Sequence, residues 1–289
     1  MGQQSRPLII KINRENLPRV KDRYPFIYLE FGRLEVDDSS IKWVSSTNEV
    51  IPIPVATISC ILLGPGTSVT HEAVKVLSSV NCLLCWTGTD SLIFYAQGLS
   101  PVSDTRNMQK QISLSFNPKS RLKVVRTMYS QRFPNDDLSD KNLNQIMLME
   151  GLRVKKCYKD FAEKYQVERH GRRYIPGHYE NNDMTNRLLT SFNNALYALV
   201  TSVVISLGYT PYVGFVHSGS PLPFVYDIAD LYKKDISIDL AFKLSKQMSN
   251  NYDRHVLLEE FEKSAVERNL IELIVKDITR IMNIDSSNS

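Results

Sequence analysis

The chain has 289 residues, of which 43% are hydrophobic and 23% charged, and its net charge is +4. This composition is typical of a folded globular protein, excludes a disordered or fibrous chain, and the length favours two domains. The longest apolar run, residues 195–207, is shorter than the roughly 20 residues that cross a bilayer, so we expect a cytoplasmic protein that does not span a membrane.

The positive charge is concentrated in the middle of the chain. Residues 101–180 carry 16 basic and 9 acidic side chains, whereas residues 1–100 carry equal numbers and residues 181–289 carry 10 basic and 13 acidic ones. A positive segment is the pattern expected of a face that meets a polyanion such as DNA. A solvated helix surface explains the same pattern equally well.

The first hundred residues predict mostly strands. Short apolar and β-branched runs there are bounded by clusters of Gly, Pro, Asp and Ser, which is typical of strands. The expected strands are residues 26–31, 41–44, 50–54, 58–63, 82–86 and 92–96, with one helix over residues 69–79.

Beyond a linker at residues 98–101, the apolar spacing becomes helical. The expected helices are residues 121–133, 143–165 and 184–207, one that begins near Pro223, and one or two over residues 257–282. The fold class is therefore predicted to be α+β, with a β-rich N-terminal domain over residues 1–98 and a larger all-α domain over residues 99–289.

The four cysteines are too few and too scattered for a disulfide scaffold. Cys82 and Cys85 have the spacing of a zinc or redox motif, but they lie in an apolar run with no second Cys or His pair nearby. A buried strand that binds no metal is the better interpretation of this pair.

The segment from His217 to Asp230 holds the main candidates for chemistry. It places an imidazole in a Gly/Pro loop and then Asp227 and Asp230 three residues apart on a predicted helix, where both can point at one place. An imidazole and carboxylates that converge make a site for a divalent cation. Far upstream, Glu150 interrupts the apolar stripe of a predicted helix, which is costly unless a cation or a donor meets the carboxylate.

Each candidate also has a purely structural explanation. Glu150 could pair with a buried arginine, and His217 could be a core histidine with satisfied ring nitrogens. Asp227 could complement the helix dipole, and Asp230 could pair with Lys234 one turn later. Helical periodicity places Asp227 at the border of the apolar stripe and Asp230 on the opposite, polar side of the helix.

Basic residues near aromatic rings are candidates for nucleic-acid contacts. Arg and Lys can hold phosphates while a neighbouring ring stacks on an unpaired base, although a solvated charge run explains such a pattern as well. The candidates are Arg121, Lys123, Arg126 and Arg132 on one predicted helix, and Arg169, Arg172 and Arg173 beside Tyr174.

Four segments, taken in order, resemble one family. They are Met149-Glu-Gly-Leu-Arg-Val154, Gly171-Arg-Arg-Tyr174, Gly214-Phe-Val-His-Ser-Gly-Ser-Pro221 and Phe224-Val-Tyr-Asp-Ile-Ala-Asp230. Together they resemble the CRISPR spacer-acquisition integrase, the near-universal DNA-inserting protein of these systems, and most of all its type I-E branch. Segments at residues 62–67, 95–98 and 122–126 extend the resemblance over about residues 24–282.

The resemblance implies a metal-dependent DNA integrase with associated endonuclease activity. In such an enzyme the 3′-hydroxyl of a short DNA duplex attacks a phosphodiester of the CRISPR array. The resemblance implies a metal site of Glu150, His217 and Asp230, with Asp227 beside it as a fourth catalytic residue. Two carboxylates and one imidazole suit Mg²⁺ or Mn²⁺ better than a structural zinc ion, and a bound cation would polarise the phosphoryl group.

The resemblance also implies the partners. These are double-stranded DNA from the spacer precursor and the CRISPR repeat, a second copy of the chain, and the small second protein of the adaptation complex. The β-rich domain would serve dimerisation and DNA contact, although Ser68 and Lys75 stand where relatives can carry Arg. With the basic candidates above, the expected DNA-binding residues are Lys75, Arg121, Arg126, Arg132, Arg172, Arg173, Tyr174, Tyr197 and Lys233.

Two other functions stay open at this point. One is a structure-selective, metal-dependent DNA nuclease that uses the same site with water as the nucleophile. The other is a non-catalytic scaffold that only holds DNA.

Clustered carboxylates without a metal should repel one another, so the substitution Asp230→Ala is predicted to raise the melting temperature.

Overall fold

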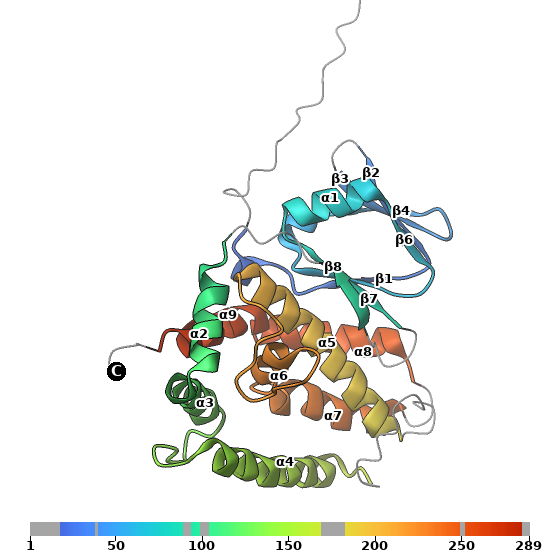
Figure 1. Cartoon of the computed structure of the whole chain (residues 1–289). Helices are drawn as coiled ribbons and strands as arrows, with labels where there is room; N and C mark the ends of the chain where they lie inside the picture. Colours follow the sequence, from blue (N-terminus) through green and yellow to red (C-terminus); the bar gives the residue numbers. More distant parts are fainter. Residues whose placement is uncertain are drawn as a thin grey trace, which may run out of the picture.

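The computed structural model describes residues 18–37, 40–88, 94–98, 104–168, 183–248 and 252–284. Strands make up most of the N-terminal part and helices make up the rest, so the predicted α+β class is confirmed (Figure 1). The N-terminal part also contains two short 3₁₀ turns, η2 (Val20–Asp22) and η3 (Val55–Thr57).

One four-stranded sheet has the order β1-β5-β7-β8. Its strands are β1 (Ile27–Leu29), β5 (Cys60–Leu63), β7 (Leu83–Thr87) and β8 (Phe94–Gly98). The first three run parallel and β8 pairs antiparallel with β7. Every residue of β5 is buried. A strand that is covered on both faces needs apolar side chains on both, which explains the continuous apolar run in its sequence.

The second sheet has the order β4-β3-β2-β6. Its strands are β2 (Gly32–Asp37), β3 (Ser40–Ser45), β4 (Val50–Ile53) and β6 (Thr67–Val69). The sequence did not predict β2 and β6, because each has few apolar residues and β6 is only three residues long. Helix α1 (His71–Ser79) packs against β2 and β7 and so covers both sheets.

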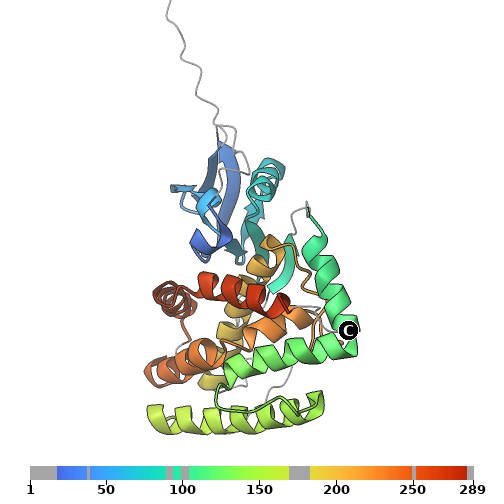
Figure 2. The same ribbon diagram turned by 90° about the vertical axis from the view of Figure 1, so that its left-hand side faces the viewer.

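The helical part forms several layers beyond the sheets (Figure 2). Its elements are α2 (Arg106–Phe116), α3 (Pro118–Arg132), α4 (Leu143–Tyr165), α5 (Met184–Ser206), α6 (Pro223–Ala229), the π-helical turn η5 (Lys234–Ile238), α7 (Asp239–Met248), α8 (Arg254–Glu267) and α9 (Leu270–Met282). Both views place α4 at the end of the molecule farthest from the strands. The helix predicted over residues 143–165 is confirmed, and it starts at a capping box of Asn142 and Gln145. The sequence did not predict α2 and α7.

The long apolar helix α5 lies at the centre of the helical core. Among the described residues it is the one helix long and apolar enough to cross a membrane, but 72% of its apolar window is buried inside the protein, as expected of a core helix. The first sheet turns Cys60, Leu62 and Cys85 toward this core and turns Ile61 and Leu63 toward the core of the β-rich part. The predicted domain boundary at residues 98–99 adjoins residues outside the described ranges and stays a prediction.

Candidate active site

The loop that carries His217 joins α5 to α6 and is held from α2. The side-chain nitrogen of Gln111 donates to the carbonyl oxygens of Thr210 at 2.9 Å and Val213 at 2.7 Å. Its side-chain oxygen accepts the N–H of Thr210 at 2.9 Å. Gln111 is fully buried, so these bonds satisfy polar groups that water cannot reach.

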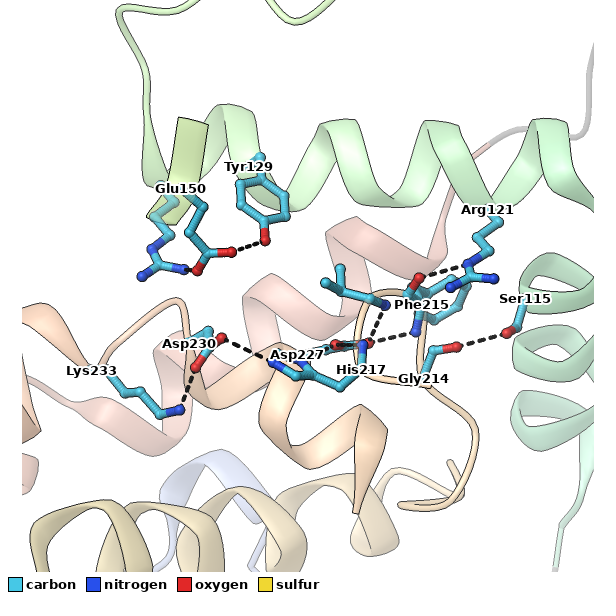
Figure 3. A network of polar contacts seen from close by, with 12 residues as sticks. Ser115, Arg121, Tyr129, Glu150, Gly214, Phe215, His217, Asp227, Asp230 and Lys233 are labelled. Atoms are coloured by element: carbon cyan, nitrogen blue, oxygen red, sulfur yellow. Dashed lines mark hydrogen bonds and ion pairs between the residues drawn. The ribbon is translucent and has the colours of Figure 1, made fainter. Parts of the chain in front are cut away.

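Two further side chains hold the next carbonyl groups of the loop. Ser115 donates to the carbonyl oxygen of Gly214 at 2.7 Å, and Nε of Arg121 donates to that of Phe215 at 2.6 Å (Figure 3). The guanidinium of Arg121 is thus directed at the protein's own backbone, although the sequence suggested DNA phosphate as its partner.

A buried carboxylate, Asp227, fixes the loop from the inside. Its Oδ2 accepts the N–H groups of Phe215 at 2.5 Å and Val216 at 3.1 Å, and its Oδ1 accepts that of His217 at 3.0 Å. Oδ1 also lies 2.8 Å from Nδ1 of the His217 ring. Because Asp227 is only 1% exposed and accepts three N–H groups of the loop besides contacting the ring, it positions the loop and the imidazole.

The close approach of Asp227 to the loop requires a glycine at position 214. A Cβ atom there would lie 2.9 Å from Oδ2 of Asp227 and 2.7 Å from Cβ of Pro223. The glycine therefore permits the carboxylate to reach three successive N–H groups.

The other ring nitrogen of His217 faces Asp230. Nε2 of the ring lies 3.7 Å from Oδ2 of Asp230. The hydrogen bond to Asp227 raises the pKa of His217, and the charge of Asp230 adds to this, whereas burial and Lys233 act in the opposite direction. A carboxylate on one ring nitrogen is the arrangement with which proteins orient metal-binding histidines.

Asp230 pairs with Lys233, whose Nζ lies 2.5 Å from its Oδ1. The Asp230 side chain is 16% exposed and faces His217, so its predicted place on a polar, outward side was wrong, and so was its pairing with Lys234. The reason is that α6 ends at Ala229 and α3 covers this face. Burial is the largest single influence and lowers the pKa of Lys233, but the charges of Asp230 and Tyr197 and the hydrogen bonds to both together raise it.

Two tyrosines complete this side of the site. Nζ of Lys233 lies 5.0 Å from the ring centre of Tyr197 on α5, which is a cation–π contact. The Tyr197 ring in turn lies 4.8 Å from that of Tyr226, centre to centre. Tyr197 therefore lies beside Lys233 and Tyr226, and its contact with DNA stays a prediction.

Glu150 approaches the site from α4 and is held by α3. Its carboxylate accepts a hydrogen bond from the hydroxyl of Tyr129 and pairs with the guanidinium of Arg132. The Arg132 and Glu150 side chains are only 13% and 16% exposed, so a mostly buried arginine does partner this carboxylate. Burial, followed by the charge of Glu150, raises the pKa of Tyr129.

A small cavity of about 10 Å³ lies between α3 and the His217 loop, with room for about one water molecule. Its lining includes His217, Asp230, and the two side chains that hold Glu150, which are Tyr129 and Arg132. Two of the three candidate metal ligands therefore line one small volume, and Glu150 is held close to it by Tyr129 and Arg132.

Within the described ranges, no group of three His, Cys, Asp or Glu side chains converges closely enough to hold a metal ion. The donor set fits Mg²⁺ or Mn²⁺ in its chemistry, because it offers two carboxylates and an imidazole oriented by a third carboxylate. Arg132 and Lys233 neutralise the two carboxylates that a divalent cation would neutralise.

The remaining predicted residues lie away from this cavity or outside the described ranges. Arg126 donates from Nε and Nη2 to the carbonyl oxygen of Lys141 and so braces the connection before α4. Lys75 is exposed on α1, in the β-rich part, and pairs with Glu72. Three further candidates, Arg172, Arg173 and Tyr174, lie outside the described residues.

Sequence reasoning missed Gln111, Ser115 and Tyr129. The first two lie on α2, which was not predicted, and no pattern distinguishes a buried Gln that holds a loop from an exposed one. Tyr129 does lie on a predicted helix, but its phase alone does not identify Glu150 as its partner.

The cysteines lie where a buried strand requires them. Cys85 lies in β7, Cys82 directly precedes that strand, and both side chains are buried. Burial raises the pKa of Cys82 to about 12, which keeps its thiol protonated. That the pair binds no metal stays a prediction.

Comparisons with known proteins give the family. A family model described as CRISPR associated protein Cas1 matches residues 132–266. The CRISPR-associated endonuclease Cas1 2 of Chlorobaculum tepidum is 53% identical over 284 residues, which is 98% of this chain and 96% of that protein. The CRISPR-associated endonuclease Cas1 of Escherichia coli K12 is 35% identical over 88% of this chain and 85% of its own length.

Solved structures agree with these relatives. The crystal structure of a TtCas1–DNA complex superposes with a TM-score of 0.70 at 31% identity, covering 93% of this chain and all of that one. A casposase bound to an integration product has the same fold, with a TM-score of 0.68 at 18% identity, covering 91% of this chain and 92% of that one. With a relative 53% identical along nearly its whole length, this chain belongs to the Cas1 family of CRISPR-associated proteins.

Proposed function

We propose that this protein is a metal-dependent DNA integrase that inserts short duplex DNA into a CRISPR array and has associated endonuclease activity. The observation that carries the proposal is the arrangement around one cavity of Asp230, a His217 ring oriented by buried Asp227, and the two side chains that hold Glu150. It occurs in a chain that is 53% identical to a CRISPR-associated endonuclease and 31% identical to a Cas1 protein solved with DNA.

Glu150, His217 and Asp230 would hold Mg²⁺ or Mn²⁺, which supplies Lewis-acid polarisation of the scissile phosphoryl group and stabilises its developing charge. The protein's own part is positioning. Asp227 holds Nδ1 of His217, so that Nε2 faces Asp230. Gln111, Ser115 and Arg121 fix the carbonyl groups of the same loop. A rigid loop keeps the imidazole in place without reorganisation during the reaction.

The nucleophile in this proposal is the 3′-hydroxyl of the incoming DNA, and no covalent intermediate with the protein is needed. Lys233, next to Tyr197, would contact the DNA backbone near its reacting end. Tyr174, Arg172 and Arg173 would bind the strand from the segment outside the described residues. We further propose the type I-E branch, a homodimer formed through the β-rich N-terminal part, and assembly with the small second protein of the adaptation complex.

A donor with a blocked 3′ end tests the proposal. A labelled duplex donor ending in a 3′-hydroxyl or a dideoxynucleotide is mixed with a repeat-bearing plasmid, Mg²⁺ or Mn²⁺ and the partner protein, and products are resolved on a denaturing gel. Both donors should bind equally well, but only the 3′-hydroxyl donor should be joined. Glu150→Gln, His217→Ala and Asp230→Asn should each abolish joining while DNA binding is retained.

The second candidate function is a nuclease that uses the same residues with water as the nucleophile, which the names of the curated relatives favour. Such a nuclease would cut branched DNA whatever the donor end. Equal product from the two donors would therefore contradict the integrase mechanism. If no DNA gives a metal-dependent product, both the integrase and the nuclease functions are contradicted, and a non-catalytic DNA-binding scaffold remains.

A further inference from the structure

Arg132 lies between two cavities. It lines the small cavity of about 10 Å³ beside His217 and Asp230, and it also lines a larger neighbouring cavity of about 540 Å³. Its guanidinium pairs with Glu150, and its Cζ lies 5.3 Å from the ring centre of Phe133. One side chain thus faces both a candidate metal ligand and a space large enough for a nucleotide.

The larger cavity is bounded by the α3–α4 connection, α4 and η5. Besides Arg132, three basic side chains line it: Arg153, Lys156 and Lys234. Of the three acidic side chains that line it, Asp136 is paired with Arg153. The cavity therefore gains an excess positive charge only when Arg132 no longer pairs with Glu150, and that excess would suit a phosphodiester.

Both oxygens of Glu150 are engaged, Oε1 by Arg132 and Oε2 by Tyr129, so a divalent cation would compete with the guanidinium for this carboxylate. A metal ion on Glu150 would stand beside the guanidinium, where like charges repel. If Arg132 simply left Glu150, a guanidinium that is only 13% exposed would lose its anionic partner, which is unfavourable for a mostly buried charge. Arg132 therefore needs a replacement anion before Glu150 becomes available.

A DNA phosphate in the larger cavity supplies that anion. The planar guanidinium binds phosphate through two parallel N–H···O bonds as readily as it binds a carboxylate. We propose that Arg132 exchanges Glu150 for a DNA phosphate in the larger cavity, and that this exchange releases Glu150 to the divalent cation. Metal binding and DNA binding are then coupled through one residue, and each tightens the other by the same factor. This inference rests on the proposed function, because it takes DNA and a divalent cation as ligands.

The test measures Mn²⁺ affinity by calorimetry or by the electron paramagnetic resonance signal of free Mn²⁺, with and without a short duplex that ends in a dideoxynucleotide. The blocked end keeps the chemistry silent, so the readout is binding alone. Wild type should bind Mn²⁺ at least about fivefold more tightly with DNA than without it. Arg132→Gln should bind Mn²⁺ more tightly than wild type without DNA, and the further gain from DNA should disappear.

Arg153→Gln is the matched control. It makes the same chemical change on the same cavity, and Arg153 lies over the same Phe133 ring at 4.1 Å, but it pairs with Asp136 and not with Glu150. It should keep the wild-type Mn²⁺ affinity without DNA and the gain with DNA. In the double variant Arg132→Gln/Glu150→Gln, the increase caused by Arg132→Gln should be absent, because the effect acts through Glu150.

The inference is overturned if Arg132→Gln binds Mn²⁺ no better than wild type without DNA, or if it keeps the full gain with DNA. It is also overturned if Arg153→Gln behaves like Arg132→Gln, since general electrostatics would then explain both. Should Arg132→Gln fail to fold, Arg132→Met replaces it, because methionine keeps much of the side-chain length without the charge. If Arg132→Met then gains as much Mn²⁺ affinity from DNA as wild type, the exchange is contradicted. Wild type that binds no Mn²⁺ even with DNA overturns the proposed metal-dependent function as well.

Discussion

Nδ1 of His217 lies 2.8 Å from Oδ1 of Asp227, and the same carboxylate accepts three consecutive backbone N–H groups of the loop that carries the imidazole. One buried side chain thus holds three N–H groups of the loop and also fixes the direction of the ring. The remaining ring nitrogen is left to face Asp230.

Asp227→Asn should destabilise the protein and misplace the imidazole. An amide has one oxygen where the carboxylate has two, so some of the N–H groups of the loop lose their acceptor in a buried place. We expect a loss of about 1–3 kcal/mol in the free energy of unfolding, measured by urea denaturation. Asp140→Asn, on an exposed turn, should remain close to wild type. Equal stabilities of the two variants would contradict the role given to Asp227.

Gly214→Ala should be far more damaging than a glycine substitution next to Glu150. The new Cβ would lie 2.9 Å from Oδ2 of Asp227, so the loop or α6 must shift. At Gly151, on α4, a Cβ meets nothing within 4 Å. Gly151→Ala should therefore stabilise the protein by about 1 kcal/mol through helix propensity. Melting curves of both variants, with DNA joining as a second readout, check this contrast.

Asp230→Ala should lower the melting temperature. The sequence predicted the opposite from carboxylate repulsion, but the structure pairs Asp230 with Lys233 at 2.5 Å. Removing the carboxylate leaves a mostly buried ammonium without its partner, which we expect to cost about 1–3 kcal/mol. The double variant Asp230→Ala/Lys233→Met should recover part of the loss. Glu163→Ala, which removes an exposed pair with Lys159, should change stability by less than about 1 kcal/mol.

Metal-free protein should lose stability as the pH rises through the folded-state pKa of His217. The hydrogen bond to Asp227 raises that pKa above its ordinary value of 6.5, so folding favours the protonated ring. The resulting contribution is complete below pH 6.5 and disappears above the raised value. Thermal melts from pH 5.5 to 8.5 should show this decline in wild type and a flatter profile in His217→Gln. An identical slope in both would show that another group titrates.

The salt dependence of DNA binding should separate structural arginines from phosphate-binding residues. Arg121 and Arg126 donate to carbonyl groups of the chain itself. Arg121→Gln/Arg126→Gln should therefore lower the melting temperature and leave the salt slope nearly unchanged. Lys155 and Lys156 are exposed on α4. Lys155→Gln/Lys156→Gln should reduce the slope of log K against log salt by about 2, measured by fluorescence anisotropy. A flattened slope in the arginine variant instead would restore the interpretation drawn from sequence.

The sequence predicted those parts of the fold whose pattern is local. Strands β5 and β7 are continuous apolar runs, and α4 has both a capping box and a regular apolar stripe. Strand β6 is too short to show a pattern, and α2 joins the fold mainly through Leu114 and the buried polar side chain of Gln111. Contacts of that kind depend on distant residues and leave no periodic signal.

The candidate site was predictable in its residue types and only partly in its geometry. Glu150 interrupts an apolar stripe, so a buried arginine could be expected as its partner. The sequence did not indicate that this arginine is Arg132, which lies on another helix. Helical periodicity misplaced Asp230, because α6 has only seven residues and the packing of α3 decides which of its faces is covered.

The first sheet belongs to two cores at once. Alternate residues of β5 contact the helical core and the β-rich core, and the Phe26 ring, just before β1, lies 5.6 Å from that of Phe261 on α8. Neither half can melt without exposing apolar surface of the other. Heat should therefore unfold the two halves in a single cooperative transition, and a substitution in the strands should shift the melting temperature of the helices that carry the site.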